Sequence, residues 1–299
     1  MKKKLRNKTP FFSIIIPCLN EEKTLPNLLS DLENQTFKDF EVIVVNGKSE
    51  DKTVQKAMKF GKKIKIGVIN CEMRGVCLQR NLGASHAKAN WLIFFDADNR
   101  IPKYFLQGIK FYIEFLDTDI LTSHIIPDTK NNKDQAIAKV INLAIDYRKN
   151  SQNPAILESM IVIKNKVFNK IGGFNNEIHW GEGADLLVRI KKAGYKFEIV
   201  KDLKYQYSFR RFRKQGTLKL LRNLAVHETA IITNKPVPKD KAVKLYPLEG
   251  GKYFEVDKET SSRIEKVFNK IIQNTPAKEL ITNGKNGVLN NLFKILGKK

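Results

Sequence analysis

Short apolar runs alternate with helical patterns over the first hundred residues, and this alternation most limits the folds open to the chain. Clusters of β-branched and aromatic residues predict buried strands at 11–16, 40–45, 65–69 and 91–95. Between the first two strands, leucines at helical spacing predict one buried helix face, formed by Leu25, Leu28, Leu29 and Leu32. Strands that alternate with helices in this way indicate a mostly parallel sheet with crossover helices, and therefore an α/β fold.

Capping residues and apolar periodicity predict further elements. Ser49, Glu50 and Asp51 are typical of a helix start, and the stretch 75–89 has a helical pattern. The second half is less regular, and there the patterns predict a helix around 137–145, a strand over 160–163 and a helix over 184–193 capped by Gly194. From about residue 235 the apolar periodicity that indicates helices and strands becomes weak. We therefore expect a basic segment 1–10, a domain 11–234 and an extension 235–299 with an amphipathic helix over 287–296.

The charge of the chain is strongly unbalanced. Lys and Arg number 54 against 31 Asp and Glu, a net charge of +23, which favours nucleotide phosphates, nucleic acid or an anionic membrane as partners. Cys18, Cys71 and Cys77 are too few and too badly spaced for a disulfide framework, so they fit a reducing compartment. No stretch approaches the roughly 20 apolar residues that span a bilayer. We therefore expect a cytoplasmic protein, at most peripheral on the inner face of the membrane.

An acidic pair, in Asp96-Ala97-Asp98, directly follows the most apolar predicted strand. Ligands of open α/β sheets bind at the carboxyl ends of strands, and two carboxylates held close together repel unless a cation neutralises them. Oxygen-rich sites of this kind suit Mg²⁺ or Mn²⁺ bridged to a diphosphate. The alternative is a turn in which both aspartates are solvated, because a D-x-D sequence is a weak signal by itself.

Four segments around this pair occur in a fixed order. They are S-I-I-I-P-C-L-N-E-E at 13–22, F-E-V-I-V-V-N-G-K-S-E-D-K-T at 40–53, R-G-V-C-L-Q-R-N-L-G-A at 74–84 and W-L-I-F-F-D-A-D-N at 91–99. Over roughly residues 11–215 the chain closely resembles the family 2 glycosyltransferases, inverting nucleotide-sugar enzymes with the GT-A fold. The resemblance implies a Rossmann-like nucleotide-binding sheet flanked by helices, followed by a helical or irregular C-terminal extension.

The resemblance also implies a donor site and a metal. Asp98 would bind Mg²⁺ or Mn²⁺ directly, Asp96 would contact the ribose or the metal, and Glu21 would accept a hydrogen bond from the ribose or the base. The full implied nucleotide-sugar site is Pro17, Cys18, Asn20, Glu21, Asn46, Arg74, Arg80, Asn81, Asp96, Ala97 and Asp98. An Arg fork suits a diphosphate whose charge grows as it leaves. Asn46 stands where the family usually has an aspartate that hydrogen-bonds to the edge of uracil. An amide can both donate and accept hydrogen bonds, so UDP-type and GDP-type donors both remain candidates.

The implied acceptor site lies in G-G-F-N-N-E-I-H-W-G-E-G-A-D-L at 172–186. Family members place an E-D pair at a helix start after the G-G-F stretch, and one of these carboxylates deprotonates the acceptor hydroxyl. Here Gly183 stands where the aspartate is usual. This leaves Glu182 as the first candidate base and Asp185 as the second, although Asp185 equally suits a helix N-terminus. His179 and Trp180 would line the sugar site or anchor the loop.

A basic segment at 201–222 interleaves Lys and Arg with Tyr and Phe. This composition suits a mobile loop over the diphosphate, or a patch on an anionic membrane that holds a lipid-linked acceptor. For either contact the main candidates are Arg210, Arg211 and Arg213. The same mixture also suits single-stranded RNA.

Residues and resemblance together predict a metal-dependent, inverting glycosyltransferase. The sugar would pass from a nucleoside-diphosphate donor to a hydroxyl of a saccharide, a lipid-linked carrier or a protein, and we do not expect nucleic acid as a partner of this enzyme. The alternative is a catalytically degenerate nucleotide-sugar or RNA-binding module, favoured by Asn46, Gly183 and the net charge of +23. A sugar-1-phosphate nucleotidyltransferase is disfavoured because its G-x-G-T-R signature is missing after the first strand.

Overall fold

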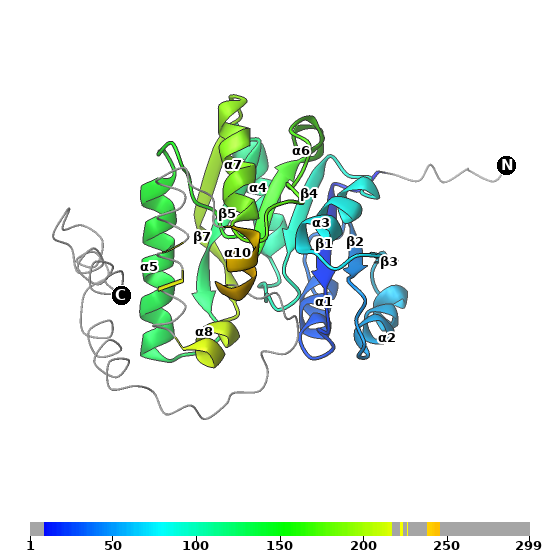
Figure 1. Cartoon of the computed structure of the whole chain (residues 1–299). Coiled ribbons are helices and arrows are strands. Elements are labelled where there is room, and N and C mark those ends of the chain that lie inside the picture. Colours follow the sequence, from blue (N-terminus) through cyan, green and yellow to red (C-terminus); the bar gives the residue numbers. More distant parts are fainter. Residues whose placement is uncertain (1–8, 217–221, 224–225, 227–237, 246–299) are drawn as a thin grey trace.

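A seven-stranded sheet forms the centre of the computed structural model, which describes residues 9–216, 222–223, 226 and 238–245 (Figure 1). The strands are β1 (Phe12–Cys18), β2 (Phe40–Asn46), β3 (Ile66–Asn70), β4 (Trp91–Phe95), β5 (Ile120–Pro127), β6 (Met160–Lys164) and β7 (Phe197–Tyr207). Their order in the sheet is β3-β2-β1-β4-β6-β5-β7, and β6 runs antiparallel to both of its neighbours while the other pairs are parallel. The predicted mostly parallel α/β sheet is confirmed.

Helices cover both faces of this sheet (Figure 1). They are α1 (Leu25–Glu33), α2 (Thr53–Met58), α3 (Val76–Ser85), α4 (Phe105–Phe115), α5 (Asn132–Arg148), α6 (Asn165–Lys170), α7 (Glu182–Lys192), α8 (Arg210–Gln215) and α10 (Lys239–Leu245), with a 3-10 helix at Lys59–Lys62. One hydrophobic core packs α1, α4 and α5 against one face, and a second packs α3, α6 and α7 against the other. Within the described ranges, no helix combines the length and the apolar character needed to cross a bilayer.

Side chains of the central strands alternate between the two cores. In β1, Phe12, Ile14 and Ile16 face the core that contains α1, whereas Ile15 faces the core that contains α3. All four side chains are fully buried. Because helices cover both faces, most positions of such strands are apolar, which is why they stand out in the sequence as apolar runs. The buried exceptions Ser13 and Glu41 satisfy each other, since the Ser13 hydroxyl donates to Glu41 at 2.8 Å.

Sequence patterns did not indicate β5, β7 or α4. The apolar run of β5 is interrupted by Thr122 and Ser123, which are nevertheless buried, and the Thr122 hydroxyl donates to the carbonyl of Met160 at 2.9 Å. Strand β7 carries exposed Lys201 and Lys204. The first part of the basic segment is therefore an edge strand, and the expectation of a mobile loop there is wrong.

Several predicted boundaries shift by a few residues. The helix expected from residue 184 begins at Glu182, and the helix expected to reach residue 89 ends at Ser85. Gly194 follows the last turn of α7 with φ +79°, the left-handed conformation of a helix cap. The predicted domain boundary at residue 234 and the predicted helix over 287–296 lie outside the described residues.

The topology brings several strand ends to one edge of the sheet. Strands β2, β1 and β4 are parallel neighbours, so their carboxyl ends, at Asn46, Cys18 and Phe95, lie together. The antiparallel register of β6 pairs Met160 with Phe95. The segment that leads into β6 therefore reaches the same edge, which we call the carboxyl edge.

Helix α3 lies so close to the sheet that Gly83 has no room for a side chain. An added Cβ would lie 2.4 Å from Cγ2 of Ile15 and 3.0 Å from Cγ2 of Val45. We expect Gly83→Ala to lower the free energy of unfolding by about 1–3 kcal/mol, despite the better helix propensity of alanine, because the core must shift. Urea denaturation checks this against Gly67→Ala in β3, where nothing lies within 4 Å of the added Cβ. Equal unfolding midpoints would contradict the close packing.

Candidate active site

A buried arginine joins four parts of the fold at the carboxyl edge. Arg80, on α3, is 1% exposed, and its Cζ lies 5.2 Å from the ring centroid of Phe174. Its Nη1 donates to Oε1 of Glu182 at 2.8 Å, and its Nη2 donates to Oδ1 of Asp96 at 2.9 Å and to the carbonyl of Glu158 at 3.0 Å. One guanidinium thus links α3 to the end of β4, to the segment before β6 and to the first turn of α7.

A second arginine reaches the same edge from α8. Arg210 donates from its two terminal nitrogens to the carboxylate of Glu21, at 2.6 and 3.0 Å, and its Nε lies 3.0 Å from Oδ2 of Asp98. Glu21 follows β1, and Asp98 follows β4. The structure therefore brings together the predicted donor-site residues Glu21 and Asp98 with one of the three predicted basic contacts.

The two arginine clusters hold more acidic than basic groups. Five of their members carry a carboxyl group and two carry a guanidinium: Glu21, Asp96, Asp98, Glu158 and Glu182 against Arg80 and Arg210. Burial raises the pKa of Asp98 to about 6, while Arg210 acts to lower it and the charges of Glu21 and Asp96 raise it further. Burial, and after it the charge of Glu182, raises the pKa of Glu158 to about 8. Added positive charge would relieve this repulsion.

The acidic pair fits a divalent cation that a diphosphate helps to coordinate. In the part of the chain that the structure describes, no three His, Cys, Asp or Glu side chains gather into a metal-binding group. Ions such as Mg²⁺, however, commonly take one or two protein carboxylates and complete their coordination with substrate phosphates and water. Asp96 and Asp98 offer such carboxylates. Arg210 competes with a cation for Asp98, because its Nε already lies 3.0 Å from Oδ2.

The loops after β1 and β2 bond to each other beside this cluster. Asn20, at φ 56°, donates its N–H to the Ser49 hydroxyl at 2.9 Å and accepts from the N–H of Glu50 at 2.8 Å. Asn46, at the end of β2, donates to Asn70 at 2.9 Å and accepts from the N–H of Ser49 at 3.0 Å. Both polar ends of the Asn46 amide are thus bonded, one to Asn70 at the end of β3 and the other to the loop after β2.

The other residues of the predicted nucleotide site differ in exposure. Pro17, Cys18 and Ala97 are buried, and burial raises the pKa of the Cys18 thiol well above its ordinary value. Arg74 lies at the surface, where it pairs with Glu50 at 2.7 Å. Its contacts are therefore with the loop after β2.

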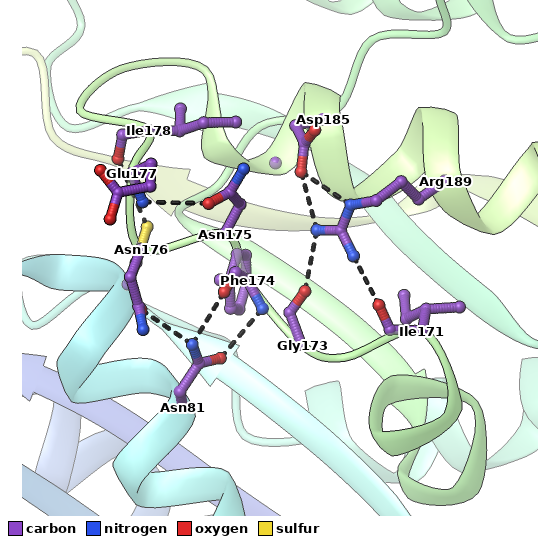
Figure 2. A network of polar contacts seen from close by, with 12 residues as sticks. Asn81, Ile171, Gly173, Phe174, Asn175, Asn176, Glu177, Ile178, Asp185 and Arg189 are labelled. Carbon is purple, nitrogen blue, oxygen red and sulfur yellow. Dashed lines mark hydrogen bonds and ion pairs between the residues drawn. The ribbon is translucent and has the colours of Figure 1, made fainter. Parts of the chain in front are cut away.

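Asn81 and Asp185 brace the turn that leads toward α7 (Figure 2). Asn81 accepts from the N–H of Phe174 at 2.9 Å and donates to the carbonyl of the same residue at 2.8 Å. Asp185 accepts from Nε of Arg189 at 2.8 Å, and Arg189 in turn donates to two carbonyls of this turn, each at 2.8 Å. Gly173, within the turn, has φ +68°, and a Cβ there would lie 2.7 Å from Oδ1 of Asn81. These contacts hold the turn in place.

The remaining predicted residues lie in the loop before α7 and on α8. His179 and Trp180 are half-buried, and Nε2 of His179 is buried without a hydrogen-bond partner among the described residues. Arg213 fixes α8 to the end of β5 through two bonds to Asp128, at 2.6 and 2.8 Å. Arg211 lies on α8 between Arg210 and Arg213.

Glu158 is the residue of this edge that sequence reasoning missed. It precedes β6 in a stretch without a recognised motif, and its Oε1 accepts from the N–H of Gly183 at 3.3 Å. The signal that could have found it is Gly183 itself, since a glycine that replaces a customary side chain leaves room for another group.

We expect Arg80→Ala to lower the free energy of unfolding by about 3–5 kcal/mol, because it leaves the buried carboxylate of Glu182 without its counter-charge. Arg74→Ala is the matched control, since it removes an exposed pair with Glu50 and should change stability by about 0–1 kcal/mol. Urea denaturation of both variants checks this. Equal losses of stability in the two variants would contradict the conclusion that Arg80 holds the carboxyl edge together.

Comparisons with known sequences point to one family. A family model described as Glycosyl transferase family 2 matches residues 13–172. Poly(ribitol-phosphate) beta-N-acetylglucosaminyltransferase TarS of Staphylococcus aureus is 33% identical over 114 residues, which cover 37% of this chain and 20% of TarS. A protein of Haemophilus influenzae described as an uncharacterized glycosyltransferase is 27% identical over 186 residues, which cover 60% of this chain and 61% of that protein. The matched part is thus about a fifth of the length of TarS.

Two solved structures share the fold. TarS residues 1–349 in complex with UDP superpose with a TM-score of 0.54 and 24% identity, over 78% of this chain and 69% of that chain. The mannosyltransferase PcManGT of Pyrobaculum calidifontis, in complex with GDP-Man and Mn²⁺, gives a TM-score of 0.58 and 16% identity, over 80% and 69%. The fold is the GT-A fold of glycosyltransferases. Because the family match extends from β1 to the turn before α7, over more than half of the sequence, the chain belongs to glycosyl transferase family 2.

Proposed function

We propose that this chain transfers a sugar, with inversion, from a nucleoside-diphosphate donor to a hydroxyl acceptor, with the help of Mg²⁺ or Mn²⁺. The observation that carries the proposal is the excess of carboxyl groups around Asp98 and Asp96 at the carboxyl ends of β1 and β4. Open α/β sheets bind their ligands at this place. The family supports the reaction class.

The donor proposed is a UDP-sugar or a GDP-sugar. TarS has been solved with UDP and with UDP-GlcNAc, and PcManGT with GDP-Man, so both nucleotide types occur among proteins of this fold. In this chain the Asn46 amide is bonded to Asn70 and Ser49, so it would shape the base pocket through the loop that it holds. A bound cation would neutralise the diphosphate and its developing charge.

The acceptor proposed is a hydroxyl of a saccharide, a lipid-linked carrier or a protein. The net charge of +23 supports contact with an anionic surface, and thus a peripheral position on a membrane. Residues 11–234 would form the catalytic domain, and 235–299 an extension of it.

Transfer with inversion needs one base and no enzyme nucleophile. The acceptor oxygen attacks C1 of the sugar from the side opposite the diphosphate while its proton passes to a carboxylate. The N-terminus of α7 is the place proposed for this carboxylate. Of the two residues that the sequence indicates there, Glu182 is bonded to Arg80 and Asp185 to Arg189.

A thermal-shift panel of UDP, UDP-GlcNAc, GDP and GDP-mannose, each with Mn²⁺ or EDTA, tests the donor site. A ligand at about 100 times its Kd adds roughly 2.7 kcal/mol to the stability of the native state. We expect such a stabilisation with Mn²⁺ for one nucleotide type, and its loss in Asp98→Ala. Asp117→Ala, which removes an exposed carboxylate paired with Lys196, is the control. Metal-dependent stabilisation that persists in Asp98→Ala, or no response to any nucleotide, would contradict the proposal.

A further inference from the structure

Glu158 and residue 183 compete for the same space at the N-terminus of α7. A Cβ added to Gly183 would lie 2.6 Å from Cγ and 3.2 Å from Cδ of Glu158, and 3.1 Å from Cγ2 of Ile156. The backbone does not demand a glycine here, because Gly183 is not among the positive-φ residues. The Glu158 side chain therefore explains why a side chain is missing at 183.

We propose that Glu158 replaces the carboxylate lost at position 183 and is the general base that takes the proton of the acceptor hydroxyl. The inference rests on the proposed glycosyl transfer and names the residue that performs its proton transfer. It differs from the sequence-based choice of Glu182, because a residue from another part of the chain fills the position.

The contacts of the three nearby carboxylates favour Glu158 over its neighbours. Glu182 holds Arg80 at 2.8 Å, and Asp185 is bonded to Arg189, which braces the turn before α7. The Glu158 carboxylate instead accepts a long bond of 3.3 Å from the N–H of Gly183, and it has no ion pair among the described contacts. A bond of that length is weak and gives way readily to a substrate hydroxyl.

The surroundings also make Glu158 a stronger base than an ordinary glutamate. Burial and the charge of Glu182 raise its pKa to about 8, which suits proton transfer near neutral pH. The ionisable groups that interact with it come from four neighbouring elements: Arg80 and Cys77 of α3, Asp96 after β4, Glu182 of α7 and Tyr205 of β7.

The proposed step conserves atoms and charge. The acceptor O–H bond breaks and its proton moves to an Oε atom of Glu158, while the acceptor oxygen forms a bond to C1 of the sugar. The bond between C1 and the β-phosphate oxygen breaks, and its electron pair leaves with the nucleoside diphosphate. Glu158 then releases the proton to water.

Glu158→Gln tests the role of this carboxylate with little change of shape. The assay measures release of UDP from UDP-GlcNAc, and of GDP from GDP-mannose, with water as the acceptor. We expect the turnover of the active donor to fall by about 10²–10⁴-fold, with nucleotide-dependent thermal stabilisation retained. Glu114→Gln, an exposed residue paired with Lys110 on α4, is the control and should keep wild-type turnover. Turnover of Glu158→Gln within twofold of wild type would overturn the assignment.

Moving the carboxylate provides a second, independent test. Gly183→Asp alone should be destabilised, because its Cβ meets Glu158, whereas combining it with Glu158→Gly removes that contact and leaves only the tight one of 3.1 Å with Cγ2 of Ile156. We expect the double variant to recover at least tenfold of the turnover lost in Glu158→Gly. A double variant that folds but recovers no turnover would contradict the proposal that Glu158 replaces a carboxylate at position 183.

Failure of the inference and failure of the proposed function give different results. If the wild-type chain turns over neither donor and neither nucleotide stabilises it, the proposed function is wrong, and the inference falls with it. If the wild type is active and Glu158→Gln is equally active, only the assignment of the base is wrong.

Discussion

The buried guanidinium of Arg80 is the interaction on which the rest of the carboxyl edge depends. A fully buried cation is stable only with close counter-charges, and Arg80 has Glu182 at 2.8 Å and Asp96 at 2.9 Å. These partners belong to segments that are distant in the sequence, so the charge holds α3, α7 and the end of β4 in one arrangement. Two hydrophobic cores support the sheet beneath, and Phe174 of one of them packs against the guanidinium at 5.2 Å.

This arrangement determines which carboxylates remain available for chemistry. Glu182 and Asp96 each have one oxygen bonded to Arg80, and Asp98 is bonded to Arg210. Glu158 lacks a comparable ion pair in the described contacts of its carboxylate, and burial, followed by the charge of Glu182, raises its pKa to about 8. The arginines thus hold Glu182, Asp96 and Asp98 in place. Of these, Asp96 and Asp98 are also the residues proposed to bind a cation, and Glu158 is the residue proposed to take a proton.

Much of the fold follows from the sequence, because strands covered on both faces are apolar at most positions. Strands β1, β2 and β4 could be predicted for this reason, and so could the apolar face of α1. Strand β5 could not, since Thr122 and Ser123 are buried in it, and β7 could not, since its exposed lysines conceal the buried positions of an edge strand. The site was predictable where a motif follows a strand. The place of Glu158 in the site could not be predicted, because it depends on the space left by Gly183, which is 25 residues away in the sequence.

The proposed reaction is a single displacement at the carboxyl edge, assisted by a carboxylate base and without an enzyme nucleophile. Proton NMR can identify the sugar first released from UDP-GlcNAc, an α-linked donor, because the two anomers have separate signals before mutarotation mixes them. We expect the β anomer to appear first. Initial release of the α anomer would show retention of configuration and would contradict the proposed inversion.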